Sequence, residues 1–357
     1  MKETVVDADA LSAYLSEHDG LTDGPVEVTD VVEHSEGWSR DTISFTATWE
    51  DESGTGSKRL VVRIESEDSP VPDEALERDI EREFRAMETA HEVGVPVATP
   101  YWYEPDESVF DGKFFVMAHR DGSAPLTWRK DIREELYAHW NSEDRALPNQ
   151  FVDALAGIHS IEPADVPFMD NADPGDVVDR ELNGWEDVFE EVTFKDEPIV
   201  REAFRWFRAN KPDIPELRLV HGDYRIGNML VDDGEITAVV DWEVARLGDP
   251  LYDVGFTSSQ YFAGKLIEPI ERPELVCALL EHEWFYDEYE ARTGITVDRH
   301  RVRYWRAWGA FTTALIFLAG ARKYVEGRSD DVRSAWFQYP VPGLLEEIAE
   351  IIVEDRI

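Results

Sequence analysis

The chain of 357 residues has few cysteines and few basic residues. Its single cysteine, Cys277, excludes an internal disulfide framework and any metal site built from several cysteines, and we interpret it as a buried structural thiol. Only 35 lysines and arginines stand against 77 aspartates and glutamates, giving a formal net charge of −42. Such a surface repels nucleic acid and anionic lipid, so neither is an expected partner. A charge of this size is typical of a halophilic protein, because high salt screens the self-repulsion.

Long apolar runs are also missing. The longest, at residues 310–319, is interrupted by threonines and is too short to span a bilayer, and the N-terminus has no charged and apolar leader. We therefore expect a cytoplasmic protein with no membrane partner. Hydrophobic residues still make up 43% of the chain, which is enough to bury a core in each of two lobes. The oligomeric state stays open.

The first third of the chain alternates between strand and turn patterns. Residues 42–49 alternate strictly between apolar and mostly hydroxyl-bearing side chains, which indicates a half-buried strand. The run EDESGTGSK that follows has the composition of a turn, and residues 60–64 resume a strand, so a hairpin is predicted. Residues 74–93 carry apolar side chains at helical spacing, and residues 114–117 supply a further strand. Together they predict a small antiparallel sheet with one helix.

After residue 118 the pattern becomes mainly helical, with one block of short strands. Helices are predicted at residues 151–159, 275–292 and 302–325, and strands at residues 217–220, 229–231 and 236–240. The sequence thus predicts an α+β protein of two lobes. The N-terminal lobe would comprise residues 1–118, with a small antiparallel sheet, and the mainly helical C-terminal lobe residues 119–357.

One stretch, LVHGDYRIGNMLVDDGEITAVVDWEVARLGDPLYDVG, concentrates residues suited to chemistry. It places Asp223 and Asn228 five residues apart in a loop between two predicted strands, and Asp241 at the end of the next strand. Carboxylate and amide oxygens suit Mg²⁺, which fills its remaining positions with water and phosphate. An aspartate beside such a metal can orient and deprotonate an attacking hydroxyl. Taken singly, each of these residues is also an ordinary turn residue.

The arrangement resembles the kinase catalytic loop H-R-D-x-x-x-x-N, here HGDYRIGN, followed by DWE where protein kinases have D-F-G. It is more similar to the aminoglycoside phosphotransferase and choline kinase superfamily, and within it to the phosphotransferase domains that animals fuse to acyl-CoA dehydrogenases. The stretches EREFRAMETAHEVGVPVATP and FFVMAHRDG and the closing helices follow in the family's order. The resemblance implies a bilobal protein-kinase-like fold that transfers the γ-phosphoryl group of ATP, with Mg²⁺, to a hydroxyl of a small molecule.

The resemblance also implies a role for each residue of the block. Asp223 would be the catalytic base, and Asn228 and Asp241 the metal ligands. The loop would be held by His221, Asp249 and Asp253.

The nucleotide-binding half departs from the usual kinase pattern by what it lacks. The loop EGWSRDT, which by the resemblance covers the ATP phosphates, has one glycine and would use backbone N–H groups with the Ser39 hydroxyl, unless it is only a polar hairpin entry. Arg63 stands where most kinases have a lysine; it keeps the charge, and Glu83 matches the family's paired glutamate. A solvent-facing Arg63 without a role is the alternative. The connector between lobes would bind adenine through backbone groups around Met117 to His119.

Two other functions stay open at this point, namely a catalytically silent kinase-like protein that binds nucleotide or a partner, and a slow nucleotide hydrolase. The intact catalytic block argues against the first. Positive charge on the C-terminal helices predicts an anionic acceptor such as a hydroxyacyl-CoA, unless these side chains pair with nearby carboxylates. The residues concerned are Arg301, Arg303, Arg306, Arg322 and Lys323, with Arg225 and Arg246 beside the catalytic residues.

Overall fold

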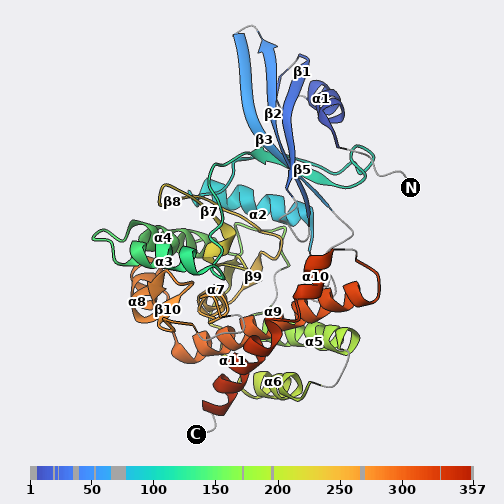
Figure 1. Cartoon of the computed structure of the whole chain (residues 1–357). Coiled ribbons are helices and arrows are strands. Elements are labelled where there is room, and N and C mark those ends of the chain that lie inside the picture. The colour runs from blue at the N-terminus through green and yellow to red at the C-terminus, as the bar shows by residue number, and fades with distance from the viewer. Residues whose placement is uncertain are drawn as a thin grey trace.

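The computed structural model describes residues 6–18, 21–22, 24–34, 40–51, 54–65, 78–170, 173–193, 197–265, 270–329 and 331–354. In this part of the chain a sheet stands at one end of the molecule and helices fill the other (Figure 1). The last strand of the sheet ends at Ala118, and mainly helical structure follows. The predicted α+β, kinase-like architecture is confirmed.

The N-terminal sheet has five strands in the order β1-β2-β3-β5-β4, each antiparallel to its neighbours. The strands are β1 (Val26–His34), β2 (Arg40–Asp51), β3 (Gly54–Glu65), β4 (Pro100–Glu104) and β5 (Phe114–Ala118). The hairpin of β2 and β3 is longer than predicted, because most of EDESGTGSK belongs to the paired strands. Gly56 lies opposite Trp49, whose indole ring covers the glycine, so cross-strand packing holds a segment of turn composition in the sheet.

Helix α2 connects the sheet to the helical region. It spans Ile80–Glu92, beginning after Asp79, whose carboxylate accepts from the Glu81 N–H at 2.8 Å. The sequence predicted an earlier start, at residue 74, but residues 66–77 lie outside the described residues. The buried side of α2 belongs to the core of the helical region, whereas a smaller core packs the sheet against α1 (Ala8–Glu17). Helix α2 is therefore fixed relative to the larger lobe.

The helical region surrounds a block of short strands. Its helices are α3 (Lys130–Trp140), α4 (Ala146–His159), α5 (Pro174–Val192), α6 (Pro198–Ala209), α7 (Leu251–Thr257), α8 (His282–Thr293), α9 (Arg299–Val325), α10 (Val332–Trp336) and α11 (Val341–Glu354). The strands β6 (Arg218–Val220) and β9 (Arg246–Gly248) pair, as do β7 (Met229–Asp232) and β8 (Glu235–Val239). Helix α9 crosses the core against α7, with Trp305, Trp308 and Phe311 buried (Figure 1). None of the described helices is long and apolar enough to cross a membrane.

One predicted helix is wrong over its first half. Helix α8 begins only at His282, and the preceding residues form a tight pair of short strands, β10 (Leu275–Val276) and β11 (Leu280–Glu281). Cys277 and Ala278 join these strands in the left-handed backbone region, with φ of 52° and 59°. The run VCALL is apolar throughout and buried, so periodicity alone does not distinguish a short strand pair from a helix there. Cys277 is buried, as we interpreted it.

Candidate functional site

The loop between β6 and β7 holds the candidate catalytic carboxylate. Asp223 lies in this loop, and Asn228 ends the 3₁₀ turn (Ile226–Asn228) that leads into β7. The Asn228 side-chain amide donates to the Asp223 backbone carbonyl at 2.9 Å and to its Oδ2 at 2.6 Å. Arg225 donates from Nε to Oδ1 of the same carboxylate at 3.0 Å. Both carboxylate oxygens of Asp223 are therefore fixed by residues of its own loop.

His221 and Asp253 fix the backbone of this loop. The N–H groups of His221 and Gly222 donate to the buried Asp253 carboxylate at 2.7 and 2.9 Å. The His221 ring lies 3.0 Å from the Val240 carbonyl through Nε2, and its Nδ1 accepts from the Asp223 N–H at 3.3 Å. Burial lowers the pKa of His221, although nearby carboxylates oppose the shift. A neutral imidazole with its proton on Nε2 satisfies both contacts and connects the loop to the residue before Asp241.

Asp249 contacts a different element from the one expected. Its carboxylate accepts from the Leu251 N–H at 3.0 Å, from the guanidinium of Arg301 and from the Trp305 indole at 2.7 Å. Arg301 and Trp305 belong to α9. Asp249 therefore fastens the start of α7 to α9, and the expectation that it braces the catalytic loop is corrected. Asp253 makes the expected contacts with the loop.

Asp241 lies just after β8 in a backbone conformation that is uncommon for a residue with a side chain. Its φ is 69°, in the left-handed region, where aspartate is better tolerated than bulkier residues. Burial, the largest single effect, would raise its pKa, but Arg63, Arg225 and His221 together outweigh burial and the pKa is lowered. Arg63 donates to Asp241 Oδ1 at 2.8 Å. The ionised form of Asp241 is thus favoured at this strained position.

Arg63 joins three elements that are distant in sequence. Its Nε atom lies 2.9 Å from Glu83 Oε1, and its Nη2 atom contacts Asp241. The Arg63 side chain is 12% exposed and that of Glu83 only 1%, so this ion pair is buried between β3, α2 and the end of β8. The pairing with Glu83 expected by resemblance is present. A solvent-facing Arg63 is excluded.

Glu243 is a site residue that the sequence reasoning missed. It follows Asp241 by two residues in DWE, and burial, with the Asp241 carboxylate adding, raises its pKa to about 7. Its carboxylate lies 3.6 Å from the guanidinium of Arg78. The acidic third residue of DWE, two positions after Asp241, was the available signal.

The oxygen atoms that remain suit Mg²⁺. Asn228 contacts Asp223 through its amide nitrogen, and its amide oxygen accepts no hydrogen bond from the described residues. Asp241 accepts from Arg63 on Oδ1 and keeps Oδ2. One amide and one carboxylate oxygen fit an ion that completes its shell with phosphate and water. Among the described residues no three His, Cys, Asp or Glu side chains are grouped to hold a metal, so these two would bind it together with phosphate oxygens.

The expected nucleotide contacts are less complete. Ser39 lies outside the described residues. Met117 pairs with Val61 and Pro100 in the sheet, and the His119 N–H donates to the Arg59 carbonyl at 3.0 Å. The Ala118 N–H likewise donates, to the Thr99 carbonyl. An adenine ring would therefore have to contact other backbone groups of the connector.

Most of the arginines proposed to contact an anionic acceptor are paired with carboxylates. Arg301 contacts Asp249, Arg303 lies 3.4 Å from Glu354, Arg306 is 2.7 Å from Glu347, Arg322 is 2.7 Å from Glu326, and Arg246 is 2.9 Å from Glu181. The structure therefore favours the alternative that these side chains pair within the protein. Arg225 is also paired, through Nε, with Asp223 at 3.0 Å.

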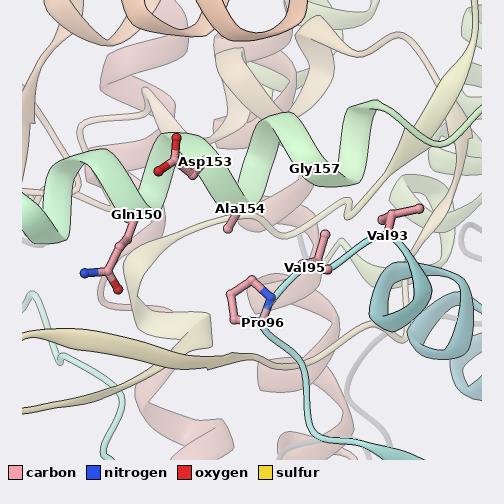
Figure 2. Close-up of a pocket in the computed structure, with 8 residues that line it drawn as sticks. Val93, Val95, Pro96, Gln150, Asp153, Ala154 and Gly157 are labelled. Carbon is pink, nitrogen blue, oxygen red and sulfur yellow. The ribbon is translucent and has the colours of Figure 1, made fainter.

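The protein also has a surface cavity of about 210 Å³, whose lining residues are drawn in Figure 2. It is lined by the segment after α2 and by one face of α4, namely Val93, Gly94, Val95, Pro96, Gln150, Asp153, Ala154 and Gly157. Its polar side chains are engaged, because Gln150 accepts from the Ile236 N–H at 2.8 Å and Asp153 from Arg292 at 2.5 Å. None of the residues of the catalytic block lines it.

Comparison with known proteins gives three consistent results. The profile of the phosphotransferase enzyme family matches residues 30–272. Acyl-CoA dehydrogenase family member 11 of Mus musculus is 26% identical over 332 residues, which cover 90% of this chain but 40% of the mouse protein. A crystal structure from Ralstonia eutropha JMP134, assigned as an aminoglycoside phosphotransferase, superposes with a TM-score of 0.71 at 22% identity and covers 98% of both chains.

A further solved structure, of the aminoglycoside phosphotransferase APH(4)-Ia in a ternary complex with AMP-PNP and hygromycin B, has a TM-score of 0.54 at 21% identity. It covers 95% of this chain and 98% of that one. These likenesses concern the fold. The chain spans less than half the length of the mouse protein.

Proposed function

Because the chain belongs to the phosphotransferase enzyme family, whose members include small-molecule kinases, we propose that it transfers the γ-phosphoryl group of ATP to a hydroxyl of a small molecule, with Mg²⁺. The observation that carries the proposal is a set of linked contacts. Asn228 donates to Asp223 and accepts on its backbone carbonyl from Val240, the residue before Asp241, which Arg63 contacts from the sheet. A protein that only binds nucleotide does not need a catalytic carboxylate held beside two side chains that could bind the metal of Mg-ATP.

Each residue has a role that follows from its contacts. Asp223 would accept a hydrogen bond from the acceptor hydroxyl and take its proton, because its carboxylate is held in place by Asn228 and Arg225. Asn228 and Asp241 would hold Mg²⁺, which when bound neutralises phosphate charge. Arg63 and Glu83 would set the position of Asp241 from the side of the sheet.

For the acceptor we propose a hydroxyacyl thioester. The likeness to acyl-CoA dehydrogenase family member 11 over nearly the whole of this chain supports this class, because acyl-CoA chemistry and a kinase-like region are joined in that relative. We also propose a cytoplasmic setting, where ATP is abundant and a lone buried thiol stays reduced.

Phosphorus NMR in molar KCl tests the proposal. The protein is incubated with Mg-ATP and, separately, with 4-hydroxyacyl-CoA esters, choline, homoserine or kanamycin. We expect ADP and a new phosphomonoester signal with the hydroxyacyl-CoA. Asp232, which is exposed at the end of β7, provides the matched control for Asp223→Asn, because Asp232→Asn also removes one carboxylate and should keep full activity.

Three other outcomes would contradict the proposal in different ways. Unchanged ATP with every acceptor would indicate a silent nucleotide-binding protein. Inorganic phosphate without a phosphomonoester would indicate a hydrolase. Kanamycin as the best acceptor would overturn the acyl thioester class but not the phosphotransfer.

A further inference from the structure

We propose that Arg225 is a catalytic residue of this transfer, whose terminal guanidinium nitrogens bind oxygen atoms of the transferring phosphoryl group while its Nε atom holds Asp223. The inference rests on the proposed function and adds a residue to it. Arg225 would thus make the phosphate contact that the sequence suggests for Arg63.

The terminal nitrogens of Arg225 are available for a ligand. Nε donates to Asp223 Oδ1 at 3.0 Å, and neither Nη1 nor Nη2 makes a hydrogen bond or ion pair with the described residues. The side chain is 29% exposed, so these nitrogens reach solvent. In contrast, Arg63 and Arg301 each contact a carboxylate through a terminal nitrogen. In a chain with a net charge of −42, guanidinium donors that remain open beside the candidate catalytic carboxylate suit an anionic ligand.

The surroundings of Arg225 fix the direction of its guanidinium. Its Cζ atom lies 5.8 Å from the centre of the Phe262 ring, a cation–π distance. On another side it lies against Gly227, where an added Cβ atom would collide with Nη1. Gly227 has no positive φ, so the backbone does not require glycine there, and the space taken by Arg225 accounts for it. Asp223 and the face of the Phe262 ring thus hold the guanidinium, and the absence of a side chain at Gly227 leaves room for it.

This position suits the chemistry of the step. The acceptor oxygen attacks the γ-phosphorus, the new O–P bond forms as the bond to the β,γ-bridging oxygen breaks, ADP leaves with that electron pair, and the hydroxyl proton passes to Asp223. Charge in the transition state is spread over the three equatorial phosphoryl oxygens. A guanidinium attached to Asp223 through Nε has its other donors next to the point where the hydroxyl meets phosphorus. Two such donors match two phosphoryl oxygens.

Binding of Mg-ADP with and without aluminium fluoride, measured by calorimetry, tests the inference without knowledge of the acceptor. Aluminium fluoride stands for the transferring phosphoryl group. In the wild type we expect it to tighten ADP binding at least about tenfold. Arg225→Gln should lose this gain while binding Mg-ADP alone within about threefold of the wild type. Gly227→Ala keeps the charge of Arg225 but displaces its guanidinium, so this variant should also lose most of the gain from aluminium fluoride.

Arg205→Gln is the matched control, because Arg205 is 75% exposed on α6 and pairs only with Glu202. It should retain the full gain, and melting temperatures should show that all variants fold. An unchanged gain in Arg225→Gln and Gly227→Ala would overturn the inference, as would a wild type that binds Mg-ADP but gains nothing from aluminium fluoride. Failure of the wild type to bind Mg-ADP would overturn the proposed function itself.

Discussion

Arg63 and Glu83 form a buried ion pair, whose energetics differ from those of a surface contact. Breaking a buried pair leaves the partner charges uncompensated, which costs about 3 to 5 kcal/mol. We therefore expect Arg63→Met to lower the free energy of unfolding by about that amount, because Glu83 and Asp241 would both lose their cation. Urea denaturation at fixed high salt measures it.

The same strand offers a matched control. Arg59 on β3 is 57% exposed and pairs with Asp121, itself exposed, so Arg59→Met should change the free energy of unfolding by less than about 1 kcal/mol. Equal losses for the two variants would show that the Arg63 pair contributes no more than a surface pair.

His221 provides a prediction for pH dependence. Burial keeps its folded-state pKa below the ordinary value of 6.5, so between the two values the unfolded chain binds a proton that the folded chain does not. Stability from the neutral ring is therefore present above about pH 6.5 and declines as the pH falls, by at most about 1.4 kcal/mol per pH unit. His221→Gln should show a shallower decline in free energy of unfolding between pH 7 and 5. If the free energy of unfolding fell equally with pH in the wild type and in His221→Gln, this prediction would be refuted.

The residues of the site divide into those the sequence could reveal and those it could not. Asp223 and Asn228 share one short loop, so their proximity follows from spacing alone. The left-handed conformation of Asp241 and the pairing of Arg63 with it depend on the approach of two lobes, which no local pattern encodes. The same holds for Arg225, whose free donors are visible only once the partners of the other arginines are known.

At the scale of elements, the approach of α7 to α9 sets the place of Asp253. Gly255 lies at this crossing, where an added Cβ atom would be 2.5 Å from Trp305 Cβ and 2.6 Å from the Val302 carbonyl. Gly255→Ala should therefore separate the helices and cost about 1 to 3 kcal/mol of stability. It should also lower activity, because Asp253 anchors the catalytic loop from the same helix.

Gly175→Ala in the first turn of α5 is the control for this change. An added Cβ atom there meets nothing closer than 3.5 Å, so its melting temperature should stay the same or rise slightly. A melting temperature of Gly255→Ala equal to that of the control would contradict the close packing of α7 on α9.

Elements with a clear periodicity of apolar residues could be predicted, whereas segments that are apolar and buried on all sides could not. The alternation in β2 has a local cause and was found in the sequence, as were the short strands that became β7 and β8. The sequence predicts a helix where β10 and β11 lie, because a run that is apolar on every side has neither helical nor strand periodicity. Helices α5 and α6 were missed although each begins with a proline, a signal that was available.

For the molecule as a whole, the net charge of −42 leads to a prediction about salt. The Debye length falls from about 10 Å at 0.1 M to about 3 Å at 1 M, so repulsion across the acidic surface is largely removed only at high salt. We expect the melting temperature and activity to rise together from 0.1 M to 2 M KCl. A melting temperature that stays constant over this range would contradict adaptation to salt.

In the proposed function Asp223 and Asp241 have separate roles: Asp223 would act on the acceptor, and Asp241 would act on the nucleotide through the metal. Turnover and Mg-ATP affinity measured side by side on Asp223→Asn and Asp241→Ala test this directly. Asp223→Asn should lose about a hundredfold or more in turnover and keep its affinity for Mg-ATP, whereas Asp241→Ala should lose both. Near-normal turnover in Asp223→Asn, or unchanged Mg-ATP affinity in Asp241→Ala, would contradict the assignment of the site.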